Sequence, residues 1–150
     1  MAHTDFAHVH HVKGMSIFAP DSVKDLQKFL CDNSRPIAVK GAGYSHGGQT
    51  LADDGVQIDM QNLCGIQYDP RGQTVTVMAG TTWYEVIKTL SSHGRTVAEM
   101  QSYYNFSVGG SISVNCHGRG MDFGAVSDTV VDLTVLTADG VLLKSYAIEQ

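Results

Sequence analysis

Residues 37–49 read IAVKGAGYSHGGQ, an apolar run of strand length that leads straight into a glycine-rich loop. Four of the nine residues from Gly41 to Gln49 are glycine, and glycine lets a backbone take positive φ and approach a ligand closely. Consecutive free N–H groups in such a loop form an anion-binding concavity, to which the side chains of Ser45 and Gln49 add hydrogen-bonding groups. The stretch therefore predicts a strand followed by a loop that binds a pyrophosphate.

The loop lacks the spacing of two common phosphate-binding motifs. The GxGxxG pattern would require glycine at the position of His46, and the Gly-Lys-Ser/Thr ending of the P-loop is missing. Because the loop alone does not identify a ligand, a mobile glycine-rich loop that binds nothing stays open as a second interpretation.

A second segment rich in small residues, SYYNFSVGGSISVNCHGRG, occupies residues 102–120. Ser107 to Ser111 place small residues where a backbone must come close to another group, and Asn115 and His117 follow at a short distance. We expect this segment to be a loop as well. Two glycine-rich loops in one small domain could hold the two halves of a dinucleotide.

The rest of the chain predicts helices and strands around these two segments. Ser22 or the preceding aspartate caps one helix, and Thr82 with Glu85 has the spacing of a capping box for another, whose early residues Trp83 and Tyr84 we expect in the core. The expected strands are 16–18, 36–40, 55–60, 66–68, 74–78, 130–136 and 141–143, with 96–100 as a short strand or a loop. A β-α-β start followed by a β-rich block predicts an α+β fold with two lobes.

Composition excludes several classes of protein. The 150 residues are 43% hydrophobic and 17% charged, which is typical of one globular domain with a core. The net charge of -5, without a cluster of lysine and arginine, argues against a nucleic-acid surface. No stretch approaches about 20 apolar residues, so we expect no membrane span.

The cysteines and the N-terminal histidines bear on the cellular compartment and on metal binding. Cys31, Cys64 and Cys116 are scattered, which favours reduced thiols in the cytoplasm and argues against a zinc site. We expect residues 1–14 to be a flexible tail ahead of a domain over 15–150. A metal-binding tail stays open as an alternative, because that segment holds four histidines: His3, His8, His10 and His11.

Three motifs together, IAVKGAGYSHGGQ, SVGGSISVNCHGRG and DLTVLTADG at residues 132–140, carry a resemblance to a known family. Over about residues 17–143 the chain resembles the FAD-binding (PCMH-type) domain of the vanillyl-alcohol oxidase and p-cresol methylhydroxylase family. It looks most like the aldonolactone oxidase, alditol oxidase and decaprenylphosphoryl-ribose oxidase branch. The resemblance implies a PCMH-type fold with two α/β lobes, present here as its N-terminal portion only and without the substrate domain.

The resemblance also implies FAD as the cofactor and assigns residues to it. The loop that wraps the pyrophosphate would comprise Gly41, Ala42, Gly43, Tyr44, Ser45, His46 and Gly47, to which we add Gln49. The positions that contact the flavin or its phosphates would be Ser102, Ser107, Val108, Gly109, Gly110, Asn115 and His117. Gly109 and Gly110 would be small because their backbone lies against the cofactor.

One position departs from the family pattern. Many members carry a histidine, bonded covalently to the flavin, where this chain has Tyr44, so we expect FAD to bind without a covalent bond. A bond from His46 is the alternative. His117 either donates to the cofactor or hydrogen-bonds within its own loop, and Tyr103 and Tyr104 either stack near the flavin or pack in their loop.

The implied activity is that of a flavin-dependent oxidoreductase acting on an alcohol group of a sugar-like or polyol substrate. FAD would accept the hydride, and a substrate domain outside this chain would bring the base, so we assign no catalytic residue. The alternative is a module that binds a nucleotide or flavin without turnover, or a truncated gene product. A metal-dependent protein is a third hypothesis, and no ligand spacing supports it.

Overall fold

The first lobe of the computed structural model, which describes residues 3–146, is a small parallel sheet with one helix. Its strand order is β3–β5–β4, and both outer strands run parallel to the central one. The elements are β3 (Ser16–Phe18), α1 (Val23–Asp32), β4 (Ile37–Lys40) and β5 (Val56–Asp59), followed by a 3₁₀ turn at Met60–Asn62. Leu26 of α1 packs against Ile58 and Leu63, which forms the core of this lobe.

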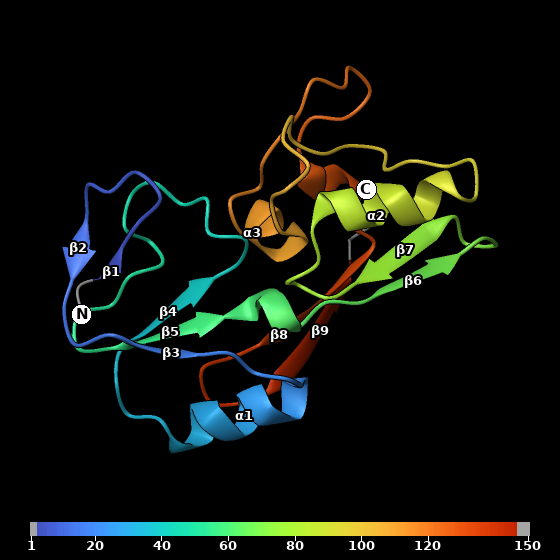
Figure 1. The fold of residues 1–150 in the computed structure, drawn as a ribbon. Helices are drawn as coiled ribbons and strands as arrows, with labels where there is room; N and C mark the ends of the chain where they lie inside the picture. Colours follow the sequence, from blue (N-terminus) through green and yellow to red (C-terminus); the bar gives the residue numbers. More distant parts are fainter. Residues whose placement is uncertain (1–2, 147–150) are drawn as a thin grey trace.

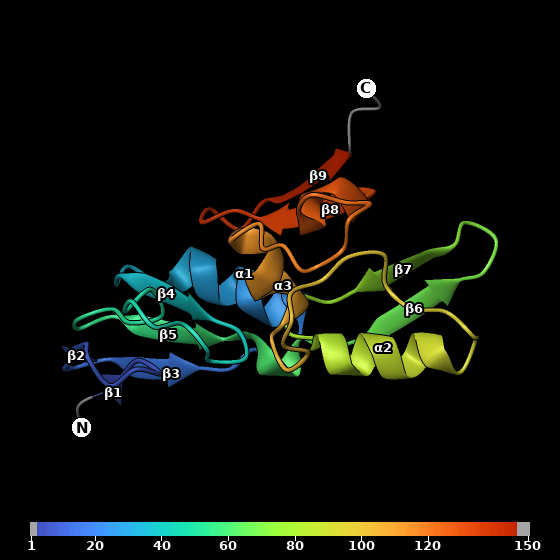
Figure 2. The same cartoon turned by 90° about the horizontal axis from the view of Figure 1, so that it is seen from above.

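The second lobe is an antiparallel hairpin covered by a helix (Figures 1 and 2). The hairpin joins β6 (Ile66–Asp69) to β7 (Thr74–Val77), and the helix is α2 (Trp83–Ser91). The capping box forms as expected, because the Glu85 carboxylate accepts from the Thr82 N–H at 2.8 Å while the Thr82 hydroxyl accepts from the Glu85 N–H at 3.4 Å. Trp83, Val86 and Leu90 face inward to make the core of this lobe.

A third helix, α3 (Val108–Ser113), lies between the two lobes (Figures 1 and 2). The indole N–H of Trp83 donates to the Ser111 hydroxyl at 2.9 Å, and the Gly109 N–H donates to the Ala79 carbonyl at 2.9 Å. A Cβ atom built on Gly109 would lie 2.8 Å from both the Cβ and the carbonyl oxygen of Ala79. The helix is therefore seated directly on the second lobe.

Two further hairpins and a short turn complete the fold. The hairpin of β8 (Asp132–Leu136) and β9 (Leu142–Tyr146) follows a 3₁₀ turn at Val126–Thr129, and lies along one side of the molecule (Figure 2). The hairpin of β1 (His3–Thr4) and β2 (His11–Val12) lies within the segment expected to be a flexible tail. No helix within residues 3–146 is long and apolar enough to span a membrane.

The structure confirms an α+β fold with two lobes and changes two local expectations. The VGG segment, expected to be a loop, is the start of α3, whereas residues 96–100 form a loop, which is one of the two states expected for them. Tyr84, expected in the core beside Trp83, is 51% exposed. Successive helical residues point about 100° apart, so burial of Trp83 directs its neighbour outward.

Gly109 and Gly110 provide a test of the seating of α3. Gly109→Ala places its new methyl group against the Ala79 backbone, so we expect it to lower the free energy of unfolding by about 1–3 kcal/mol. The matched control is Gly110→Ala in the same helix, whose Cβ would lie 3.0 Å from the Ser107 side chain and near no backbone outside the helix. Urea denaturation of both variants measures the difference, and equal stability would show that the close contact has no energetic weight.

The β8–β9 hairpin predicts self-association of this chain. Leu142 and Leu143 are successive strand residues on opposite faces, and both are about half exposed, while both strands of the pair also have a free edge. Exposed apolar faces with free strand edges favour pairing between molecules. We expect light scattering to show species larger than a monomer and Leu143→Lys to reduce them. A monomeric wild-type chain at high concentration would contradict this expectation.

Candidate cofactor site

The glycine-rich loop follows β4 directly, and its backbone uses the freedom that glycine provides. Gly43 and Gly48 adopt φ of +85° and +75°, values that residues with a side chain rarely take. Residues 41–45 of the loop are half-buried, while His46, Gly47 and Gln49 are exposed. The loop is therefore anchored at its beginning and accessible at its tip.

An ion pair fixes the beginning of this loop. The Lys40 ammonium at the end of β4 lies 2.8 Å from the Asp59 carboxylate at the end of the neighbouring strand β5. Burial raises the pKa of the Asp59 carboxyl, but the hydrogen bonds from Lys40 and Gln61 outweigh it and hold that pKa below its ordinary value. The carboxylate stays charged near neutral pH and orients Lys40 beside Gly43, whose added Cβ would lie 3.2 Å from the lysine Cε.

The structure brings the two glycine-rich segments into contact at Ser107. The Ala42 N–H donates to the Ser107 hydroxyl at 3.3 Å, and a Cβ atom on Gly41 would clash with the same oxygen. Only glycine at position 41 allows this approach. The pairing of the two segments, expected from sequence, therefore exists as a direct contact between the lobes.

The remaining candidate residues are distributed around α3. Val108 is buried in the core and presents only its backbone, while Gly110 is exposed beside Ser107. Asn115 and His117 lie beyond the other end of the helix. The Asn115 amide oxygen accepts from the Ser127 N–H of the 3₁₀ turn at 3.1 Å, and the His117 Nδ1 lies 3.3 Å from the Gly118 carbonyl oxygen within its own loop.

A cluster of aromatic rings surrounds Tyr44, where many family members carry histidine. The Tyr44 ring lies 5.3 Å from Phe6, 5.4 Å from Tyr103 and 5.0 Å from Phe106, measured between centroids. These four residues, called the aromatic cluster below, come from three separate segments. Tyr44 therefore ties the glycine-rich loop to the chain on both sides of it.

The two tyrosine hydroxyl groups of the aromatic cluster influence each other. The neighbouring Tyr103 hydroxyl raises the pKa of Tyr44, with burial acting in the same direction. Tyr44 in turn lowers the pKa of Tyr103, whose oxygen accepts from the Asn105 amide at 3.2 Å. These opposite shifts reflect the close approach of the glycine-rich loop to the second segment.

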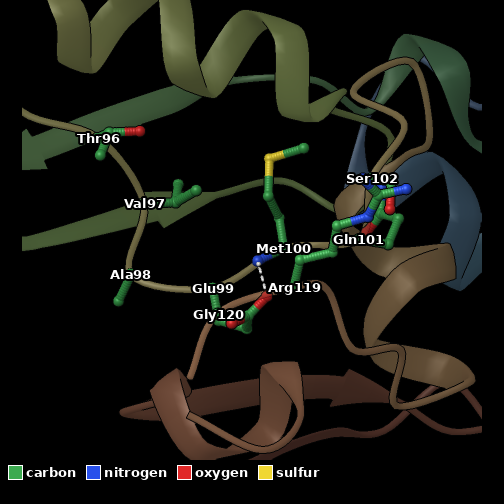
Figure 3. A pocket seen from close by; sticks show the side chains of 9 residues that line it. All are labelled: Thr96, Val97, Ala98, Glu99, Met100, Gln101, Ser102, Arg119 and Gly120. Carbon is green, nitrogen blue, oxygen red and sulfur yellow. Dashed lines mark hydrogen bonds between the residues drawn. The ribbon is translucent and has the colours of Figure 1, made fainter. Parts of the chain in front are cut away.

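A cavity of about 480 Å³ opens beside the second segment (Figure 3). It is lined by residues 96–102 together with Arg119 and Gly120. Of the candidate cofactor residues, Ser102 alone lines this cavity. Glu99 is 5% exposed, with one carboxylate oxygen accepting from the Met100 N–H at 3.1 Å and the other without a partner among the described residues. No pattern in the sequence distinguishes Glu99, because only the fold buries it.

Metal-ligating side chains do not gather in the part of the chain that the structure describes. Within it, no group of three or more histidine, cysteine, aspartate or glutamate side chains is placed to hold a metal ion. Cys31, Cys64 and Cys116 are free thiols, and the Cys116 thiol donates to the Gln101 amide oxygen at 3.1 Å. Cys116 is thus engaged in loop packing.

The geometry fits a dinucleotide such as FAD on two observations. Gly43 and Gly48 have positive φ and carry no side chain, so the first loop turns at these two positions with its backbone accessible, as an anion-binding backbone requires. The contact of Ala42 with Ser107 places the second segment beside it. Residues from both lobes thus converge at one edge of the molecule.

Comparisons with known proteins agree with this geometry. The family model described as "FAD binding domain" matches residues 16–146. An uncharacterized oxidoreductase, ORF5 in the fasciation locus of Rhodococcoides fascians, is 32% identical over 93% of this chain and 32% of its own length. Cytokinin dehydrogenase 3 of Arabidopsis thaliana is 31% identical over 93% of this chain and 28% of its own, and L-gulonolactone oxidase of Bos taurus is 28% identical over 85% and 30%.

Among solved structures, cholesterol oxidase from Brevibacterium sterolicum superimposes with a TM-score of 0.84 at 20% identity, covering 97% of this chain and 31% of that one. This likeness shows the fold. The chain spans about a third of the length of the curated relatives it matches. It belongs to the family of FAD-binding (PCMH-type) domains of flavin-dependent oxidoreductases, and FAD is its cofactor.

Proposed function

We propose that this chain is the FAD-binding portion of an oxidoreductase that oxidises an alcohol group, on a sugar-like or polyol substrate. The observation that carries the proposal is the contact between the Ala42 N–H and the Ser107 hydroxyl, which joins the two glycine-rich segments into one binding edge. Bound FAD supplies the hydride acceptor. The chain supplies the surface that binds and orients it.

We propose that backbone groups of the first loop bind the phosphates and that the second segment contacts the flavin. The N–H groups of the loop would bind the pyrophosphate, with Ser45 and Gln49 adding side-chain donors. The Gln49 amide oxygen accepts from the Gly47 N–H at 2.9 Å, which holds this side chain against the loop. The proposed cofactor residues remain the full set: Gly41, Ala42, Gly43, Tyr44, Ser45, His46, Gly47, Gln49, Ser102, Ser107, Val108, Gly109, Gly110, Asn115 and His117.

The alcohol substrate is supported by the names of some relatives and opposed by those of others. L-gulonolactone oxidase and D-arabinono-1,4-lactone oxidase carry sugar lactones in their names, whereas others are cytokinin dehydrogenases. We place the residue that takes a proton from the alcohol in the part of the relatives that this chain does not span. We place the protein in the cytoplasm because its cysteines are unpaired.

A flavin-binding module without turnover is the second candidate. Anaerobic mixing of the longest natural form with sugars and polyols tests it: a flavin absorbance spectrum that stays oxidised would favour this candidate.

Retention of FAD tests the binding edge. We expect the purified chain, mixed with FAD and desalted, to retain flavin absorbance, and we expect Gly41→Val to retain at least tenfold less because its side chain would separate the loop from Ser107. The matched control is Gly65→Ala, whose Cβ would make an ordinary contact of 3.4 Å with Met78. Equal retention by Gly41→Val and the control would place the flavin elsewhere.

The nature of the flavin attachment is tested by acid precipitation. We expect wild-type flavin to appear in the supernatant, because a tyrosine at position 44 does not form the histidyl bond. Tyr44→His restores the residue that many family members carry, and we expect it to leave part of the flavin in the pellet. Wild-type flavin in the pellet, lost on His46→Ala, would instead identify His46 as the attachment site.

A further inference from the structure

The hairpin formed by residues 3–12 contacts the cofactor loop although it lies outside the matched family region, which begins at residue 16. Its two strands pair His3 with Val12 and Thr4 with His11. The turn between them carries Phe6 and His10 toward the loop. We call this hairpin the clasp.

Four contacts spread along the loop join it to the clasp. The Phe6 N–H donates to the Ser45 carbonyl at 3.2 Å. The Phe6 ring lies 5.3 Å from the Tyr44 ring and 5.0 Å from the His46 ring. Further along, a Cβ on Gly48 would lie 3.1 Å from the His10 ring, so the clasp follows the loop from Tyr44 to Gly48.

A buried carboxylate holds the clasp in shape. Asp5 is 3% exposed, and it accepts from the N–H groups of Val9 and His10 at 3.1 and 3.4 Å while its second oxygen lies 2.8 Å from the His10 Nδ1. Burial raises the pKa of Asp5, but the hydrogen bonds from His10 and Val9 outweigh it and keep that pKa below its ordinary value. The carboxylate is therefore charged at neutral pH and orders the turn that carries Phe6 and His10.

The clasp touches the lobe at its rim. A cavity of about 220 Å³ separates it from the sheet, with Asp5 and Phe6 on one side and Lys40 and Gln57 on the other. The core residues Leu26, Ile58 and Leu63 do not include any residue of the clasp. Loss of the contacts at Phe6 is therefore expected to make the loop less ordered and to leave the core of the lobe intact.

A glycine-rich loop loses conformational entropy when it closes on a ligand, and contacts that order it beforehand reduce this cost. We propose that the clasp pre-orders the loop Gly41–Gln49 for its ligand, with Phe6 and Asp5 as positioning residues. The proposal rests on the cofactor role proposed for that loop. It assigns to residues 3–12 a function in cofactor affinity that the family match does not cover.

Hydrogen exchange of the chain without FAD tests the clasp independently of binding. We expect Phe6→Ala to raise amide exchange in peptides spanning residues 41–49 several-fold, with Phe6→Tyr restoring the wild-type rate. The matched control is Val9→Ala, an exposed residue of the same hairpin, which should leave exchange unchanged. Asp5→Ala, which removes the brace, should act in the same direction as Phe6→Ala.

The affinity for FAD, measured by the quenching of FAD fluorescence on binding, gives the functional readout. We expect Phe6→Ala to weaken FAD binding about tenfold, which corresponds to about 1.4 kcal/mol, while the melting temperature stays at that of Val9→Ala. Phe6→Leu, a milder change, serves if Phe6→Ala melts lower. If amide exchange in residues 41–49 is the same for Phe6→Ala and Val9→Ala, the proposed role of the clasp is wrong. If the wild-type chain does not bind FAD but Phe6→Ala still raises amide exchange, only the cofactor role of the loop is wrong.

Discussion

The start of α3 is bonded to both lobes, and the rest of the site depends on this junction. The N–H groups of Val108 and Gly109 donate to the carbonyls of Thr81 and Ala79 in the second lobe, at 2.8 and 2.9 Å. The Ser107 hydroxyl accepts from Ala42 in the first lobe. Two of these contacts join backbone groups, and the third joins a backbone N–H to the short Ser107 side chain, so small residues are needed where they form. Gly41 and Gly109 satisfy that condition, and each would clash with its neighbour if it carried a Cβ.

A junction of this kind explains why the candidate site consists mainly of glycine and serine. Glycine serves two different purposes in it. Gly43 and Gly48 take backbone conformations that other residues rarely adopt, which shapes the loop for an anion. Gly109 instead gives room to Ala79, so its small size has a packing reason apart from any cofactor.

The aromatic cluster stabilises the loop next to the junction, because its Phe106 directly precedes Ser107. Tyr44, the residue at which the sequence departs from the family resemblance, packs against Tyr103, Phe6 and Phe106. Aromatic contacts of this kind contribute about 0.5–1.5 kcal/mol beyond burial. The loop is thus held at Ala42 by the junction and at Tyr44 by the cluster, and the clasp extends this order to its tip.

The sequence by itself determined the features that depend on neighbours along the chain. Caps at Ser22 and Thr82, strand-length apolar runs and the glycine-rich loop were predicted correctly because hydrogen bonds and periodicity act locally. Only the tertiary structure decided the helical state of the VGG segment, which Ala79 and Thr81 stabilise from outside it. The same holds for the buried carboxylates of Asp5 and Glu99, because burial is a property of contacts between segments distant in sequence, and the pattern of residues around a lone acidic side chain carries no information about them.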